Sequence, residues 1–329
     1  MVIFLMEKGE IMDAKTLPQK LPSESISIFF KRSFSHRDLN ALGIGLLALL
    51  IYSVITQGIN PILIYVFALL GALPFELGFA KLRKRVVDLA WWFTPLLFTM
   101  MVPATLTHLW MASVGGAVAS FYGKLVFGGH GKYPFLPAAV GMVFLSVSFP
   151  TYMLVVGNTA ADLKSLDGFA FDFIELLVGP TPGFIGDPFR LGILLLAGIF
   201  AFLKVIDLRL TLSYLLGVIG FVALFWWIES MNPTIFAEVA KFPEPTYVAL
   251  VGSVAFASVF LITDKTTAPR NGVAKIVYGL LAALITTIIR YFTGSVEGVV
   301  YAVLLANAFS PLIDAWISKK AIPLTVGGK

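Results

Sequence analysis

Two residue types that build metal and redox centres are scarce in this chain. Cysteine is absent from its 329 residues, and the only histidines are His36, His108 and His130. Without cysteine, disulfides, thiolate zinc sites and cysteine-ligated iron–sulfur clusters are excluded. No two histidines are three or four residues apart, so neither a haem nor a histidine-rich metal centre is expected. Any electron carrier must therefore be organic, or must be held by other subunits.

Charge is also scarce. Only 13% of the residues are charged and 58% are hydrophobic, whereas a soluble domain carries about 25% charged residues. The composition predicts an all-α polytopic membrane protein. The net charge of +5 could suggest a nucleic-acid partner, but the basic residues lie in short loops between apolar runs. Membrane topology explains them better.

Apolar runs near the roughly 20 residues that a membrane span requires recur along the chain. They predict ten transmembrane helices, at about 39–57, 60–79, 87–106, 109–127, 135–156, 189–206, 210–228, 247–263, 274–290 and 297–316. The region from Pro103 to Trp110 could instead form a broken or re-entrant helix.

The distribution of basic residues predicts the orientation. An even number of spans places both ends of the chain on one side, and all but four of the 24 lysines and arginines fall there; the exceptions are Lys164, Arg190, Lys241 and Arg290. Under the positive-inside rule that side is cytoplasmic. We therefore expect a multi-pass protein of the cell membrane with cytoplasmic tails at 1–38 and 317–329. The cluster at Lys81–Arg85 is its strongest anchor.

A hydrophilic segment at 157–188 divides the predicted spans into two sets of five, at 39–156 and 189–316. An odd number in each set gives the two halves opposite orientations, which is the plan of an inverted repeat. The segment is predicted to lie on the outer side of the membrane, opposite the two tails, and it is acidic. It could attract cations, or it could be a solvated loop.

The stretch from Gly123 to Pro150, GKLVFGGHGKYPFLPAAVGMVFLSVSFP, joins a glycine-rich turn to an apolar run. Glycines allow unusual backbone angles and close approach, and the prolines after them stiffen the chain. Such a stretch either connects two membrane helices tightly or lines a site.

Four motifs in order carry a family resemblance. They are TPLLFTMMVPATLTHLWMASVGG, the stretch above, FLITDKTTAPRNG and GVVYAVLLANAFSPLID. From about Pro95 to Asp314 the chain resembles the D subunit of the Rnf complex and, more distantly, the B subunit of the sodium-translocating NADH:quinone reductase. The resemblance implies ten spans in two inverted five-helix repeats with a urea-transporter-like fold. It also implies bound FMN and partner subunits with iron–sulfur and flavin centres. In such a complex, electron flow from ferredoxin to NAD is coupled to sodium or proton pumping.

The resemblance also indicates where a cofactor would bind. Backbone amides of glycine-rich turns suit a flavin phosphate, and apolar walls suit its ring, although each turn could be a simple helix connection. The expected cofactor-binding residues are Gly128, Gly129, Gly131, Phe135, Pro137, Asp167, Gly168, Gly183, Gly186 and Asp187.

The chain departs from the family at several of these positions. The family esterifies FMN to a threonine in the motif D-G-x-S-x-A-T, but this chain reads Asp167-Gly168-Phe169-Ala170-Phe171. Asparagines of the central motif appear as Tyr133 and Leu136, its arginine as Met142, and the family's G-E-x-S as Gly186-Asp187-Pro188-Phe189. We expect any FMN to be bound without a phosphoester, between the Gly128–Gly131 turn and the Gly183–Gly186 loop, or to be absent.

Polar residues within the apolar runs are further candidates, because each is costly in a bilayer. Asp264, Asn307 and Asp314 could line an ion pathway. Alternatively, the two aspartates could cap helix ends and Asn307 could bond to a neighbouring helix. Glu76 and Asp88 are expected to pair with the basic cluster.

The main functional prediction is a membrane electron-transfer subunit of an Rnf-type complex, which is not catalytic alone. The alternatives are a channel or transporter on the same scaffold, or a structural subunit that has lost its flavin. No Ser/His/Asp triad or P-loop pattern occurs, so hydrolysis is not predicted.

Overall fold

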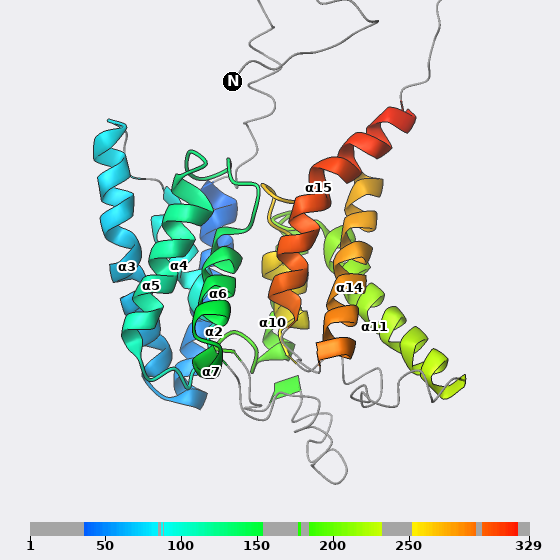
Figure 1. Cartoon of the computed structure of the whole chain (residues 1–329), viewed down its shortest axis with the longest axis horizontal. Helices are drawn as coiled ribbons and strands as arrows, with labels where there is room; N and C mark the ends of the chain where they lie inside the picture. The colour runs from blue at the N-terminus through cyan, green and yellow to red at the C-terminus, as the bar shows by residue number, and fades with distance from the viewer. Residues whose placement is uncertain are drawn as a thin grey trace, which may run out of the picture. The chain divides into compact units, whose positions relative to one another are not determined.

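Regular structure in the described part of this chain is almost entirely helical (Figure 1). The computed structural model describes, within the unit of residues 33–329, the ranges 36–84, 87, 89–153, 177–178, 184–231, 252–293 and 298–321. In these ranges the one contact of strand type is an isolated antiparallel bridge between Pro103 and Phe184. The expected helical class is confirmed for this part of the chain.

Within the described ranges, five helices are long and apolar enough to cross a bilayer, namely Arg37–Gln57, Asn60–Leu82, Leu208–Met231, Gly272–Arg290 and Val299–Ile317. The full set in the described ranges is α2 (His36–Gln57), α3 (Asn60–Leu82), η1 (Leu89–Trp91), α4 (Phe93–Met100), α5 (Leu109–Ser120), η2 (Phe121–Leu125), α6 (Pro137–Ser148), α7 (Pro150–Met153), α10 (Arg190–Phe202), α11 (Leu208–Met231), α13 (Val254–Phe256), η3 (Ala257–Leu261), α14 (Gly272–Thr293) and α15 (Val299–Ala321). Each of the ten predicted spans contains at least one helix. Several of these helices are too short to cross alone.

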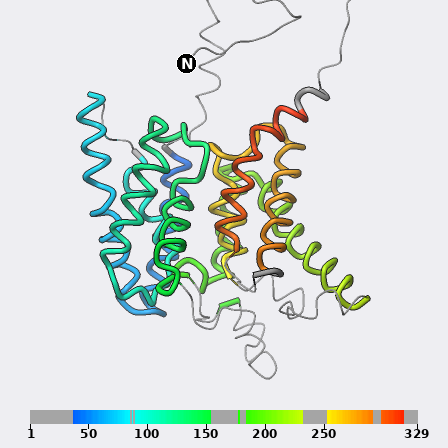
Figure 2. The backbone as a smooth tube through the Cα atoms, viewed as in Figure 1, coloured from blue at the N-terminus to red at the C-terminus, as the bar shows by residue number. Residues whose placement is uncertain are grey.

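The same pattern of helix packing occurs twice along the chain. In the first half α2 contacts α4, α3 packs on α5, and α5 packs on α6. In the second half α10 contacts α13, α11 packs on α14, and α14 packs on α15. The backbone tube follows both sets (Figure 2). We call residues 36–153 the first half and residues 184–321 the second half.

Glycines allow the main helix pair of each half to approach closely. A Cβ atom on Gly116 of α5 would overlap the carbonyl of Ala68 in α3, and one on Gly279 of α14 would overlap Ser213 in α11. Small residues at helix contacts are typical of membrane proteins, where association depends on van der Waals packing rather than on expulsion of water. These positions therefore fix both pairs at short range.

The third predicted span, 87–106, is broken rather than continuous. Helix α4 ends at Met100, shortly before Pro103, because proline lacks an amide proton and disfavours a helical residue before it. The carbonyls left at this helix end are bonded from the second half: Gly186 N donates to Met100 O (2.8 Å) and Ile185 N to Val102 O (3.0 Å). The broken-helix alternative for this region agrees with the structure.

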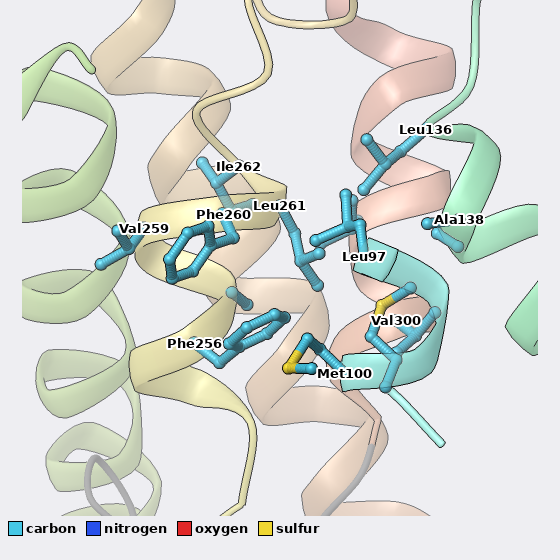
Figure 3. Packing of buried hydrophobic residues seen from close by; sticks show 14 of the residues in the cluster. Leu97, Met100, Leu136, Ala138, Phe256, Val259, Phe260, Leu261, Ile262 and Val300 are labelled. Carbon is cyan, nitrogen blue, oxygen red and sulfur yellow. The ribbon is translucent and has the colours of Figure 1, made fainter. Parts of the chain in front are cut away.

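The centre of the core lies where the short helices α4 and α13–η3 meet (Figure 3). Leu97 and Met100 come from α4, and Phe256, Phe260 and Leu261 come from α13–η3; all five are buried. The rings of Phe256 and Phe260 stack with centroids 5.0 Å apart. The core therefore joins the two halves.

Candidate functional site

The glycine-rich turn between η2 and α6 has the backbone geometry that its sequence predicts. Gly128, Gly129 and Gly131 have φ values of 114°, 100° and 78°, a region that side-chain-bearing residues rarely adopt. The amides of this turn bond within the chain: Gly128 N donates to Leu125 O and Gly129 N to Lys124 O, both at 3.1 Å. These two amides therefore do not fit the expected role of phosphate donors.

Tyr133 connects this turn to the second half. Its hydroxyl donates to Asp264 Oδ2 at 3.0 Å, and Thr266 N donates to Asp264 Oδ1 at 2.6 Å. Tyr133 and Asp264 are both buried. Two further predicted site residues follow: Phe135 is partly buried, and Pro137 is buried at the first position of α6. Tyr133, whose position the resemblance assigns to asparagine, thus stabilises the carboxylate of a predicted site residue.

A second polar cluster surrounds Asp187. This carboxylate accepts hydrogen bonds from Ser253 Oγ (3.0 Å) and Phe184 N (3.2 Å), and Arg190 and Arg290 act on it electrostatically. Asp187 and both arginines are each 1% exposed. Buried ions require such partners, because desolvation costs several kcal/mol per charge. The cluster brings together charges from two segments, Asp187–Arg190 and the end of α14, inside an apolar fold.

Gly186, which precedes Asp187, occupies a place where a side chain has no room. A Cβ atom at this position would lie 2.9 Å from the Phe256 ring and 3.0 Å from Met100 O. The remaining predicted site residues of this region, Asp167, Gly168 and Gly183, lie outside the described residues.

Asn307 and Asp314 have the helix-stabilising contacts that were one of their two expected roles. Tyr278 OH donates to Asn307 Oδ1 at 2.6 Å, which links α14 to α15. Asp314 accepts bonds from Arg270 N at 2.9 and 2.7 Å and from Asn271 N at 3.2 Å. Such contacts stabilise helix ends and helix pairs. A role for either residue in ion passage stays a prediction.

An ion pair at Glu76 was missed by sequence reasoning. Lys124 Nζ lies 2.5 Å from Glu76 Oε1 and 3.4 Å from Ala90 O, and both side chains of the pair are buried. The expectation that Glu76 pairs with the Lys81–Arg85 cluster is therefore wrong. Lys124 lies in the π-helix η2 rather than in a loop, and such π segments often mark functional sites. The sequence signal for this pair was the place of Lys124 inside an apolar run, where a lysine needs a partner.

Comparison with known proteins gives this fold a family. Residues 31–323 match the model of the NQR2, RnfD, RnfE family. The chain belongs to this family. Together with its five apolar helices, membership identifies a multi-pass membrane protein and confirms the resemblance carried by the four motifs.

Relatives in the family include subunits of two kinds of complex. The D subunit of the ion-translocating oxidoreductase complex of Methanosarcina acetivorans is 32% identical over 79% of this chain and 81% of its own length. The B subunit of the Na(+)-translocating NADH-quinone reductase of Neisseria meningitidis is 29% identical over 86% of this chain and 73% of its own length. The corresponding Yersinia pestis protein is 31% identical over 77% of this chain and 65% of its own length.

The described parts of the two glycine-containing segments, between which a flavin is expected, lie near opposite ends of α13–η3. Tyr133 contacts Asp264 at one end of α13–η3, and Asp187 contacts Ser253 at the other. Eleven positions separate Ser253 from Asp264, a distance of about 16 Å if all of them had the helical rise of 1.5 Å per residue. Between these ends lie buried residues of α13–η3, among them Phe256, Phe260 and Leu261 (Figure 3). A flavin between the two segments stays a prediction.

Proposed function

We propose that this chain is the membrane subunit of an ion-translocating oxidoreductase complex of the Rnf type. The observation that carries this proposal is the family match over residues 31–323. The relatives' names support it, because they are subunits of complexes that couple redox chemistry to ion movement. The chain has no cysteine, so partner subunits supply the iron–sulfur clusters.

The architecture we propose is a pair of inverted five-helix repeats, 39–156 and 189–316, related to urea-transporter-like folds. The recurring packing of α3 on α5 and of α11 on α14 supports two related halves. In such repeats the transported species passes near the interface of the halves, where broken helices meet. Helix α4 stops at such a place, and the buried charges around Asp187 lie beside it.

Ion passage is the chemistry that buried charges suit best in a membrane fold. Ionisable residues in spanning segments are costly and mark ion pathways. Asp264 and Asp187 each accept two hydrogen bonds from the chain, so their carboxylates are held in fixed positions. We assign these aspartates to the ion route. We also propose that the protein lies in the cell membrane, with segments 1–38 and 317–329 on the cytoplasmic side.

Affinity purification of the tagged full-length chain tests this function. Co-purification of iron–sulfur and flavin subunits, with ion uptake driven by reduced ferredoxin or NADH, is the expected result. A homo-oligomer that moves a solute without any redox partner would instead support the channel or transporter alternative. Redox partners without any flavin on this chain would support the structural alternative.

We propose that any flavin of this subunit is bound without a phosphoester, or is absent, because Phe171 stands where the resemblance places the acceptor threonine and has no hydroxyl group. A denaturing gel of the purified complex, viewed for flavin fluorescence, tests this expectation. No fluorescent band should run with this chain, and its intact mass should equal that of the polypeptide. A fluorescent band with the added mass of FMN would refute it.

A further inference from the structure

Two consecutive residues of the second half, Asp264 and Lys265, contact two separate elements of the first half. Asp264 accepts the hydroxyl of Tyr133 from the glycine-rich turn at 3.0 Å. Lys265 Nζ lies 2.6 Å from Asp38 Oδ2, in the first turn of α2. The side chains of this ion pair are 33% and 16% exposed. We call these four residues the clasp.

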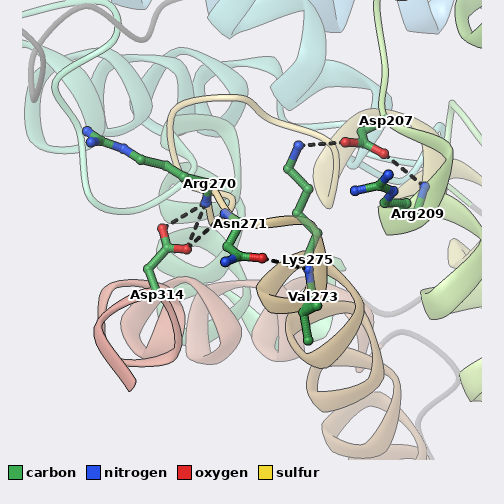
Figure 4. Close-up of polar contacts among 7 residues, drawn as sticks. All are labelled: Asp207, Arg209, Arg270, Asn271, Val273, Lys275 and Asp314. Carbon is green, nitrogen blue, oxygen red and sulfur yellow. Dashed lines mark hydrogen bonds and ion pairs between the residues drawn. The ribbon is translucent and has the colours of Figure 1, made fainter. Parts of the chain in front are cut away.

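The segment that carries Asp264 and Lys265 is fixed to the second half (Figure 4). The backbone amides of Arg270 and Asn271 bond to Asp314 of α15. Lys275 Nζ lies 2.5 Å from Asp207, just before α11. Any movement of the second half therefore carries this segment with it, and the clasp is where the segment crosses to the first half.

Among the described residues, a second polar junction between the halves is of a different kind. Near the end of α4, Gly186 N and Ile185 N donate to Met100 O and Val102 O, and all four residues are buried. Backbone bonds shielded from water are costly to break. In the clasp, the Asp38–Lys265 ion pair is partly exposed, and such a pair is weak and is screened by salt. The other clasp contact, Tyr133–Asp264, joins two buried residues, but it is a single side-chain hydrogen bond rather than a pair of backbone bonds. The apolar contacts of α15 on α6 and of α10 on α2 can accommodate small sliding movements.

We propose that the clasp is a releasable contact that opens and closes as the two halves rock about the backbone junction at Met100–Val102. The backbone junction at Met100–Val102 is the pivot and stays in place. The side-chain contacts of the clasp separate when the halves move apart. This inference deepens the proposed function, on which it rests, because it names the moving part of the ion-translocating subunit. An ion can then pass between the halves without a continuous pore, as in rocking transporters.

Paired cysteines in this cysteine-free chain test the clasp directly. Asp38→Cys with Lys265→Cys places two thiols across it, for closure by a short, reducible bis-thiol crosslinker in the purified complex. Asp207→Cys with Lys275→Cys is the matched control, because it replaces an aspartate–lysine pair whose two residues both move with the second half. Crosslinking the clasp should lower redox-driven ion uptake about ten-fold, since gating motions often limit turnover, and reductant should restore it. The crosslinked control should keep its rate. A crosslinked clasp that turns over like the control would overturn the inference.

Spin-label distances in the same variants separate this inference from the proposed function. If the reduced complexes show no redox-driven ion uptake, the proposed function fails, whatever the crosslinks do. Labels at positions 38 and 265 should nevertheless show a second, longer distance, which grows when Tyr133→Phe is added; labels at 207 and 275 should show one distance throughout. A single unchanged distance at 38 and 265 would refute the clasp even in an active complex.

Discussion

Lys124 and Glu76 place two opposite charges inside an apolar fold, 2.5 Å apart. Removing both from water costs several kcal/mol per ion, and their attraction offsets this cost only while both are present. The π-helix η2 sets the position of Lys124, because its extra residue per turn shifts the side chain relative to an ordinary helix. The pair therefore depends on both partners.

Replacing one partner of this pair should destabilise the protein strongly. Lys124→Met leaves the Glu76 carboxylate buried without its ammonium partner, and we expect a loss of about 3–5 kcal/mol of stability. Adding Glu76→Leu should recover most of it, because apolar groups replace both charges. Unfolding in detergent measures the effect, with Lys81→Met on the exposed end of α3 as control. Equal unfolding midpoints for Lys124→Met and Lys81→Met would contradict the prediction.

Asp207 should make stability depend on pH in the acid range. Partial burial alone would raise its pKa, but the hydrogen bonds from Lys275 and from Arg209 N, with the charges of both residues, hold the pKa below its usual value. A carboxyl with a lowered folded-state pKa stabilises the fold above its unfolded pKa of about 4. This contribution is lost as pH falls through the folded value.

Asp207→Asn should therefore flatten the loss of stability below about pH 4. Because the Asp207 side chain is about one-third exposed, the difference from the wild type should stay under about 1 kcal/mol. Unfolding midpoints of both proteins, measured across this range, test it. Parallel pH curves would show that Asp207 has no such role.

Sequence reasoning succeeded at residues whose role is local. Positive φ at Gly128, Gly129 and Gly131 follows from the turn itself, and the bond of Asn307 to a neighbouring helix follows from its place in an apolar run. It failed at Lys124 and Arg290, which were counted as loop residues. Their ionic partners come from segments far away in sequence, and no local pattern encodes such pairs.

At the scale of elements, apolar run length predicted where helices occur but not where they break. The run at 87–106 has the composition of a full span, yet the helix ends at Met100. The carbonyls beyond that point are satisfied by residues 185 and 186, which lie in another part of the sequence. Hydropathy cannot distinguish a continuous helix from a helix followed by a tertiary backbone junction. The proline at 103 was the only local signal.

Close helix packing makes Gly116 intolerant of a side chain. Gly116→Ala forces a methyl group into the Ala68 carbonyl of α3, and overpacking of this kind costs about 1–3 kcal/mol. Gly220→Ala in α11 is a matched control, because nothing lies within 4 Å of its Cβ position. Alanine there should be neutral or stabilising, since it favours a helix over glycine. If both variants unfold alike in detergent, close packing at Gly116 is not limiting.

The orientation of the whole molecule in the membrane is predicted from the distribution of its basic residues, and the burial of three of them changes that count. Lys124, Arg190 and Arg290 are buried, so they do not act as loop charges under the positive-inside rule. Omitting them removes one basic residue from the proposed cytoplasmic side and two of the four exceptions, leaving Lys164 and Lys241. The predicted asymmetry therefore becomes stronger.

Single cysteines can report this orientation without background, because the chain contains none. Ser318→Cys lies in α15 near the proposed cytoplasmic tail, and Ser165→Cys lies in the proposed outer segment. An impermeant maleimide added to intact cells should label position 165 alone, and position 318 should react only after the membrane is opened. Since an even number of crossings separates the two tails and an odd number separates each from position 165, labelling of both positions from one side would refute the ten-span arrangement as well as its orientation.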